Sequence, residues 1–372
     1  MPLMMASPEV AIRPTSVDEV VAAVREHQRI HVVGAATKSA MAARRCDATR
    51  MEMTLLSGVV DHQPSEFLIT ALAGTTIAEL QKSLDAHGQY FPFDPPLVDA
   101  GATIGGTVAA GLSGPGRLKY GGIRDFVMGI RLVDGTASVV TGGGRVVKNA
   151  AGYDLPKLMV GSGGFLGPIV EVTLKIFPRP AIESSLRIKV ADFATAISLQ
   201  STLARSAVEL TALDLLPDAT LLVRLSGDQS AVVVSADRVE KIAIAHSSSA
   251  VVERCGQDTA MWSPLLDASW LDAGDRLVRV PLPPVKLTEF ERSLAEAMVP
   301  RRYSVAGNLA WVRWPAARPL AQLDELLRFH AIGGTVLIGQ ASQYRLGNRG
   351  NASMTARLKS ALDPSGKFVG AA

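Results

Sequence analysis

Polar and charged side chains gather among glycines in the stretch TGGGRVVKNAAGYDL, residues 141–155. Glycines let a ligand come close to the backbone, and cationic and amide groups can then donate hydrogen bonds to it. The residues of this kind are Lys148, Asn149, Tyr153 and Asp154. Taken alone, Tyr153 and Asp154 also fit a helix start that the aspartate caps. The stretch is therefore a candidate lining for a ligand site, with Lys148 and Tyr153 as candidate catalytic groups.

Two further small-residue segments have the character of anion cradles. A phosphate needs backbone N–H groups aimed at it, and only small residues let the backbone approach that closely. VGAATKSA follows a β-branched run directly, and ATIGGTVAA stands where a helix is expected to begin. Either one alone is more often a turn or a packing contact. Neither matches G-x-G-x-x-G or the GK[ST] P-loop, which disfavours a nicotinamide Rossmann site and an ordinary NTPase.

The composition narrows the class of protein. A chain of 372 residues is long enough for two domains, and a net charge of +3 without clustered Lys and Arg argues against nucleic acid as a partner. Cys46 and Cys255 are too few for an iron-sulfur cluster held by this chain alone, and they fit a reducing compartment. The start shows no secretory signal, and no apolar run is long enough to span a membrane. We expect a soluble cytoplasmic protein. The mean hydropathy of +0.22 hints that another subunit covers apolar surface.

Helices and strands alternate in the first half of the chain. Ser16 and Glu19 predict a capping box for a helix with valines at helical spacing, and the β-branched run 30–33 predicts the strand after it. Thr76 and Glu79 predict a second capping box. These local patterns predict helix, strand and small-residue loop in succession.

The middle of the chain predicts a hairpin and then a domain boundary. Asp134-Gly135 lies between two apolar runs, which is a strong hairpin signal. A later strand ends in Pro178-Arg179-Pro180, where we expect the boundary. Beyond it, two βαββα-like halves predict an α+β domain built on an antiparallel sheet. The expected division is residues 1–180, joined by the returning tail 346–372, and a cap or interface domain of residues 181–345.

Six motifs occur in a fixed order in this sequence. They are PT-x-x-x-EV at residues 14–20, GAATKS, ATIGGTVAAG, YGGIRDFVMGIRLVDG, KNAAGYDL and GSGGFLG. In this order they resemble the FAD-binding domain of the vanillyl-alcohol oxidase / p-cresol methylhydroxylase (PCMH-type) superfamily. Within it, the sequence is most similar to the FAD-binding E-type subunit of bacterial glycolate oxidase. After Pro180, the likeness rests on the two-half layout and on DPSGKF near the end.

The resemblance implies a two-part PCMH-type FAD-binding domain with an α+β cap domain, and FAD held without a covalent bond. The segment 148–154 would run beside the flavin ring, which needs an apolar slot and donors where charge builds up on reduction. The residues implied to contact FAD are Gly34, Ala35, Ala36, Thr37, Lys38, Ser39, Pro95, Ala102, Thr103, Ile104, Gly105, Gly106, Val108, Lys148, Asn149, Tyr153, Gly161, Ser162, Gly164, Leu166, Gly167 and Ile169.

The sequence departs from the family in three places. Ala310 stands where relatives that oxidise 2-hydroxy acids by themselves carry a histidine, and no two of the six histidines have ligand spacing, so a metal site is not expected. Lys38 occupies the loop in which a covalently attached flavin would need a histidine. Phe165 replaces the hydroxyl residue of the family's GS-x-GTLG turn, which removes one polar contact to the cofactor.

The resemblance implies a subunit of a glycolate oxidase-like complex, cytoplasmic or membrane-associated through its partners. The complex would oxidise glycolate to glyoxylate, with a homologous flavoprotein subunit and an iron-sulfur subunit as partners. Alternatives are a stand-alone FAD-dependent 2-hydroxy acid or alcohol dehydrogenase, a non-catalytic structural subunit, and a reductase of the cell-wall precursor type. In an enzyme, an arginine should clamp the substrate carboxylate. The candidates are Arg279, Arg302, Arg313 and Arg345, each also readable as a surface residue.

Overall fold

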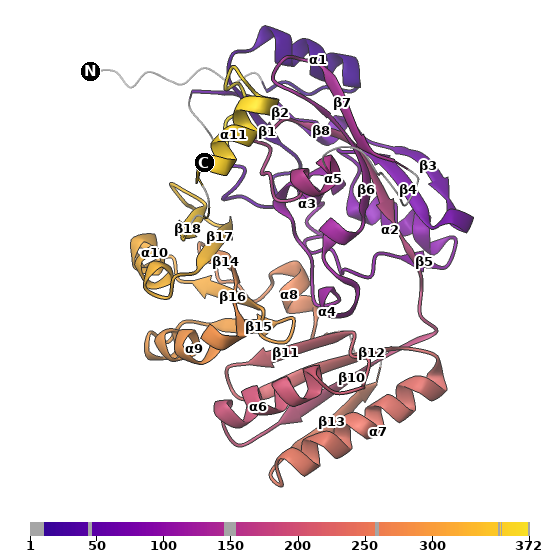
Figure 1. Cartoon of the computed structure of the whole chain (residues 1–372), viewed down its shortest axis with the longest axis vertical. Helices are drawn as coiled ribbons and strands as arrows, with labels where there is room; N and C mark the ends of the chain where they lie inside the picture. The colour runs from indigo at the N-terminus through magenta and orange to yellow at the C-terminus, as the bar shows by residue number, and fades with distance from the viewer. Residues whose placement is uncertain are drawn as a thin grey trace.

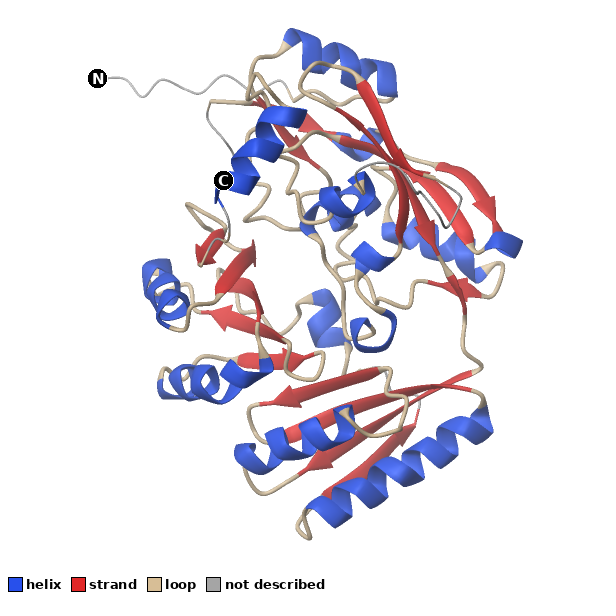
Figure 2. Cartoon of the chain, in the orientation of Figure 1, coloured by secondary structure: helices blue, strands red, loops and turns tan. Residues whose placement is uncertain are grey.

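The computed structural model describes residues 11–43, 47–144, 154–256, 260–348, 350 and 352–370. Two tiers are visible in Figure 1: strands and helices from the first half of the chain, joined by the C-terminal helix α11, form the upper one, and the remaining second half forms the lower one. Figure 2 shows that both tiers mix helices with sheets. The expected α+β class is confirmed, and both large sheets are antiparallel.

The upper tier is built on a five-stranded sheet in the order β3-β4-β8-β6-β7. Two small sheets accompany it, a parallel pair β1-β2 and an antiparallel pair β5-β9. The helices are α1 (Val17–Glu26), α2 (Ile77–Asp85), α3 (Ile104–Ala110), α4 (Arg117–Tyr120) and α5 (Leu155–Met159). The strands are β1 (Ile30–Val33), β2 (Thr49–Glu52), β3 (Val59–Gln63), β4 (Leu68–Leu72), β5 (Gln89–Tyr90), β6 (Val127–Val133), β7 (Val139–Gly143), β8 (Ile169–Lys175) and β9 (Phe177–Pro178).

Local sequence signals explain where these elements begin and end. The capping box of α2 forms as predicted, with Thr76 and Glu79 exchanging hydrogen bonds. The first predicted box is only half formed: Ser16 Oγ accepts from Glu19 N, but the Glu19 carboxylate accepts from Thr15 instead of Ser16. Thr15 supplies both a backbone N–H and a hydroxyl to that carboxylate, so it is the better partner.

The predicted hairpin is β6-β7, but its turn is longer than the two-residue type. Residues 134–138 connect the strands, and Asp134 Oδ1 accepts from the backbone N–H groups of Thr136 and Ser138. The side chain of Asp134 thus closes the turn. Gly135 N–H is left to donate to Leu362 O, 2.8 Å away, which ties the hairpin to the end of the chain.

The lower tier is one nine-stranded sheet in the order β13-β10-β12-β11-β15-β16-β14-β17-β18. Its two halves meet through a single pair of residues, Leu215 and Tyr303. The strands are β10 (Ile182–Lys189), β11 (Ala212–Leu216), β12 (Thr220–Gly227), β13 (Val251–Gly256), β14 (Arg276–Pro281), β15 (Arg301–Ser304), β16 (Leu309–Trp314), β17 (Gly333–Ile338) and β18 (Arg345–Gly347). The helices are α6 (Phe193–Ala204), α7 (Gln229–His246), α8 (Ser263–Asp267), α9 (Leu287–Glu296) and α10 (Leu320–Phe329).

The second half of this sheet has two different faces. Val278, Val280 and Val336 pack in the same core as the α9 and α10 side chains. Leu277 and Leu337, which alternate with them, pack instead in the core of the upper tier. Because side chains alternate between the faces of a strand, residues such as Arg279 point toward the upper tier.

The end of the chain returns to the beginning. After α11 (Ala352–Leu362), Phe368 pairs with Ile30 of β1, and its buried ring joins the core around α1. Figure 1 shows α11 beside β1 and β2. The Asp363 carboxylate, fully buried, accepts from Lys367 N and Phe368 N. The tail is therefore part of the packing of the upper tier.

A buried ion pair joins the two tiers. Arg224 of β12 donates to the Asp94 carboxylate, which also accepts from Gly116 N at 2.6 Å. Both charged side chains are largely withdrawn from solvent. None of the described helices is long and apolar enough to cross a membrane.

Candidate FAD site

The loop that follows β1 is the centre of the site. It reverses at Ala36, whose φ of 56° lies in the left-handed region. Among the described residues, no protein acceptor pairs with the backbone N–H groups of residues 35–39. A row of free N–H groups on a tight loop is an anion-binding arrangement. These donors are therefore available to a ligand.

Small residues let this loop lie against α3. A Cβ added to Gly34 would come within 2.6 Å of Thr103 Oγ1, and one added to Gly105 would come within 2.7 Å of the Ala73 Cβ. Both distances are far below normal contact, so glycine is needed at both positions. The two small-residue segments that the sequence singles out are thus brought together.

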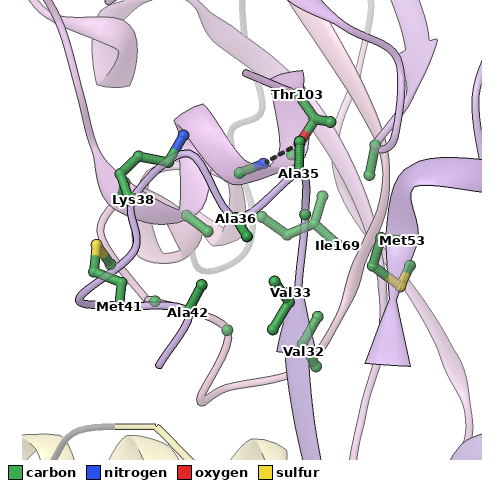
Figure 3. A pocket seen from close by; sticks show the side chains of 18 of the residues that line it. Val32, Val33, Ala35, Ala36, Lys38, Met41, Ala42, Met53, Thr103 and Ile169 are labelled. Carbon is green, nitrogen blue, oxygen red and sulfur yellow. Dashed lines mark hydrogen bonds between the residues drawn. The ribbon is translucent and has the colours of Figure 1, made fainter. Parts of the chain in front are cut away.

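The start of α3 contributes shape more than donors. Ile104 N donates to Thr75 O, and Gly105 N donates to Ala73 O. Thr103 caps the helix, with its Oγ1 accepting from Gly106 N at 3.3 Å (Figure 3). Because these amides are already engaged, the loop at 35–39 supplies the free donors.

A buried lysine faces the same space. The side chain of Lys38 extends from the loop toward α3, and its Nζ would lie 3.7 Å from a Cβ on Gly106 (Figure 3). Lys38 is only 8% exposed, and no described residue offers its ammonium a carboxylate or a hydrogen bond. Burial lowers the pKa of Lys38 to about 8. An unpaired buried cation beside free amides fits a phosphate-bearing ligand.

The cavity between the loop, α3 and the glycine turn has a volume of about 80 Å³, and we call it the FAD slot. Complete ligand sites commonly measure about 300 to 1,000 Å³, so the slot holds only part of a dinucleotide. Its lining includes ten of the expected contacts: Gly34, Ala35, Ala36, Lys38, Thr103, Gly105, Gly106, Gly164, Gly167 and Ile169. Nine residues that the sequence analysis missed complete it: Val32, Val33, Met41, Ala42, Met53, Ala73, Ala109, Ala110 and Gly163.

The missed residues carried weak signals. Val32 and Val33 end a predicted strand, and Ala109 and Ala110 belong to the quoted ATIGGTVAAG motif. Met53 and Ala73 come from β-rich segments without polar markers, so only the fold brings them to the slot.

The other expected contacts lie elsewhere or outside the described residues. Pro95 lines a separate cavity near Arg179 and Glu183. Ala102, Ile104, Val108 and Leu166 are buried in the core of the upper tier. Thr37, Ser39, Gly161 and Ser162 are not among the lining residues of the slot, although Ser162 Oγ is buried and has no partner among the described residues. Lys148, Asn149 and Tyr153 fall in 145–153, outside the described residues.

Phe165 points away from the slot. Its ring lies between two cations, Arg345 at 5.7 Å and Lys359 at 5.8 Å from the ring centre. Lys359 also donates to Phe165 O. The phenylalanine therefore anchors the glycine turn to β18 and α11.

A second cavity, about 380 Å³ in volume, lies between the upper tier and the sheet of the lower tier. We call it the cap-facing cavity. It shares Met41 and Ala110 with the FAD slot, so the two are neighbours. Its polar lining comes from Arg279, Thr335, Tyr344, Arg345 and Asn348.

Arg279 is the most buried cation of this cavity. Its Nη1 donates to Gly111 O at 2.6 Å, and its buried Nε has no hydrogen-bond partner among the described residues. Burial and the neighbouring Arg117 lower the pKa of Arg279 to about 10. The Tyr344 hydroxyl is also buried and has no hydrogen-bond partner among the described residues. Gly163 leaves room for this hydroxyl, because a Cβ at residue 163 would lie 2.6 Å from Tyr344 Oη.

Two of the other candidate arginines, Arg302 and Arg313, are already paired with carboxylates. Arg302 donates to the Asp214 carboxylate at 2.7 Å. Arg313 forms ion pairs with Asp272 and Asp275, and it lines neither the FAD slot nor the cap-facing cavity. This geometry argues against Arg313 as the substrate clamp, because its charge is already neutralised. The sequence pattern itself favours Arg279 over the other arginines: Arg279 alternates with Val278 and Val280 along a strand, so its side chain lies on the opposite face from these valines.

Ala310, at the position of the family's histidine, is buried in β16. It lies opposite Val280 and Tyr303 on the neighbouring strands, and its side chain packs in the core beside α9 and α10. Within the described residues, no group of three or more His, Cys, Asp or Glu side chains could hold a metal ion.

Comparison with known proteins agrees with this geometry. Residues 8–143 match the family model of the FAD binding domain. The fold resembles alkyldihydroxyacetonephosphate synthase, with a TM-score of 0.69 and 16% identity, over 96% of this chain and 75% of that protein. The chain thus has a PCMH-type FAD-binding fold, and the matching FAD binding domain indicates FAD as its cofactor.

Two relatives place it more narrowly. Over 160 residues it is 39% identical to "Glycolate oxidase subunit GlcE" of Escherichia coli (strain K12), which covers 43% of this chain and 46% of that protein. Over 186 residues it is 31% identical to "D-lactate dehydrogenase" of Anaerostipes hadrus, 49% of this chain and 39% of that protein. The match spans less than half of either relative. The expected resemblance to FAD-binding subunits of glycolate oxidase is confirmed.

Proposed function

We propose that the chain is the FAD-carrying subunit of a complex that oxidises a small 2-hydroxy acid, such as glycolate to glyoxylate. The observation that carries the proposal is the place of Arg279: it is partly buried with its Nε withdrawn from solvent, lacks a carboxylate partner among the described residues, and lines a cavity next to the FAD slot. FAD, when bound, accepts the two electrons that such an oxidation releases. The names of the relatives support the substrate class.

In this proposal, residues of one cavity bind the cofactor and residues of the other bind the substrate. In the FAD slot, the N–H groups of residues 35, 36 and 38 and the Lys38 ammonium would hold the diphosphate, without a covalent bond to the flavin. In the cap-facing cavity, Arg279 binds the substrate carboxylate and the Tyr344 hydroxyl hydrogen-bonds the neighbouring substrate oxygen.

The oxidation requires partners in this proposal. One relative is named as a subunit of glycolate oxidase, which supports assembly with a homologous flavoprotein subunit. An iron-sulfur subunit would carry the electrons onward, because the two cysteines of this chain are too few to hold such a cluster.

The test begins with an absorption spectrum of the chain purified alone, before and after acid precipitation. We expect a flavin spectrum that moves to the supernatant with acid, because the FAD is not covalently bound. Addition of glycolate or lactate, with and without the partner subunits and a dye acceptor, then tests the oxidation. A folded but colourless protein that takes up no added FAD would contradict the proposal and favour a structural subunit.

A further inference from the structure

Three polar residues of the cap-facing cavity are aligned across neighbouring strands. Arg279 of β14 is the register partner of Thr335 in β17, and Thr335 is the register partner of Arg345 in β18. Residues directly opposite in antiparallel strands share one face of the sheet. The two arginines therefore project from the same face, about 10 Å apart at their Cα atoms by two strand spacings, with the small Thr335 between them.

Both arginines reach toward the upper tier. Arg279 ends at Gly111, at the C-terminus of α3. The Arg345 guanidinium lies over the rings of Phe165 and Tyr344, at 5.7 and 6.0 Å from the ring centres. Both cations thus line the cap-facing cavity, and Arg345 also lines a neighbouring cavity beside α11.

The cavity lacks negative charge among the described residues. Its lining contains these two arginines and no aspartate or glutamate. No described carboxylate forms an ion pair with Arg279 or Arg345, and the positive charge of Arg117 helps to lower the pKa of Arg279. Partly buried like charges without counter-ions are unfavourable unless an anionic ligand joins them.

A monocarboxylate satisfies only one of the two cations. Arg279 is suited to the carboxylate next to the oxidised carbon, because it is the deeper cation and borders the residues shared with the FAD slot. Arg345 then faces the far end of the substrate, with Thr335 as a neutral spacer. The volume of about 380 Å³ leaves room for a longer acid than glycolate.

From this geometry we propose that the cap-facing cavity selects 2-hydroxy acids that carry a second carboxylate, with Arg345 as the residue that recognises it. The inference rests on the proposed function, since it takes the ligand to be a hydroxy acid. It deepens that function by assigning a substrate class: hydroxy diacids bind more tightly than hydroxy monoacids of the same backbone.

The test measures binding to the purified FAD-loaded protein by calorimetry. Malate is compared with lactate, and 2-hydroxyglutarate with 2-hydroxybutyrate, using both enantiomers. Each pair differs by one carboxylate. A charge-assisted hydrogen-bonded contact should favour the diacid about tenfold or more. Arg345→Met should bring each pair to similar affinities without weakening the monoacids, and Arg345→Lys should keep part of the preference because it keeps the charge.

Two further variants make the result specific. Arg292→Met removes the same charge from an exposed position on α9 and should leave the diacid preference unchanged. Arg279→Met should weaken both members of each pair. The thermal midpoint and the flavin spectrum of each variant show whether it is folded and loaded.

The failures of the two proposals are distinguishable. Equal affinities for diacid and monoacid in the unaltered protein, or a diacid preference that survives Arg345→Met, would overturn the selection of diacids and leave hydroxy acid oxidation standing. If a loaded, folded protein binds none of the four acids, both proposals fail.

Discussion

Lys38 shows how one buried side chain can link cofactor binding to stability. Its ammonium lies in the FAD slot without a counter-ion among the described residues, and burial lowers its pKa to about 8, from 10.5. Lys38 is the one charged residue among the described residues that line the slot. The charge therefore disfavours the folded protein without FAD and favours the complex with the diphosphate.

We predict opposite effects of Lys38→Met on these two properties. FAD affinity of the apoprotein, measured by fluorescence titration at pH 7, should fall by about tenfold or more, because a charge-assisted contact is lost. The free energy of unfolding of the apoprotein should rise by up to about 3 kcal/mol, the order expected when a buried charge is removed. Lys82→Met, at an exposed position of α2, is the control and should change neither.

The lowered pKa of Lys38 fixes the direction in which stability and FAD affinity change with pH. In the apoprotein the pKa of Lys38 is lowered on folding, so the cost of the charge is complete below about pH 8 and fades as the pH rises toward 10.5. The stability gain of Lys38→Met should therefore be present at pH 7 and disappear near pH 10.5. FAD affinity of the unaltered protein should decline above pH 8, and a flat profile there would exclude Lys38 as the phosphate partner.

At the scale of elements, β1 depends on the far end of the chain. Lys367 O accepts from Ile30 N at 2.8 Å, and Ile30 O accepts from Val369 N at 2.9 Å. The strand that leads into the anion-binding loop thus has β2 on one side and the tail after α11 on the other. The position of the anion-binding loop therefore depends on both β2 and the tail.

Phe368→Ala tests this support. The ring of Phe368 is 2% exposed, so its removal should cost about 3 to 5 kcal/mol of unfolding free energy. FAD affinity should fall as well, since β1 carries the loop. Phe329→Ala removes the same ring from a position that is 82% exposed and should cost less than about 0.5 kcal/mol. Urea denaturation with and without FAD measures both, and equal losses in the two variants would contradict a supporting role of the tail.

At the scale of the whole molecule, two ion pairs differ in burial: Arg224–Asp94 joins the tiers, and Arg179–Asp85 lies within the upper tier near their junction. Arg224 and Asp94 are buried, whereas Arg179 and Asp85 are more than half exposed. The difference in burial predicts a difference in energy, because a partner left unpaired in the interior keeps the desolvation cost of its charge.

We predict that Arg224→Met destabilises the protein by about 3 to 5 kcal/mol, and that calorimetry then resolves separate unfolding of the two tiers. Arg179→Met, near the same junction, should cost no more than about 1 kcal/mol. The double variant Arg224→Met/Asp94→Leu should recover part of the loss, because it removes the stranded carboxylate. Identical midpoints for the two single variants would show that burial of the pair does not matter.

What can be predicted from the sequence depends on how far apart along the chain the interacting residues lie. The cap at Thr76 and the strand at 30–33 depend on neighbours in the chain, and both form where local rules place them. The cofactor class was predictable because its small-residue motifs are short. The alignment of Arg279 with Arg345 was not, since it depends on the register of three strands. Nor could local patterns reveal that the α3 amides are already engaged by residues 73 and 75.

The return of the tail to β1 also sets an order of events during synthesis. Lys367 donates to Val24 O across 343 positions of the chain. A ribosome adds about 5 to 20 residues per second, so roughly some tens of seconds pass between the synthesis of β1 and the synthesis of the tail that pairs with it. The nine-stranded sheet can assemble in that interval, whereas the cofactor loop cannot reach its final support. FAD binding should therefore be one of the last steps in the synthesis and folding of the protein.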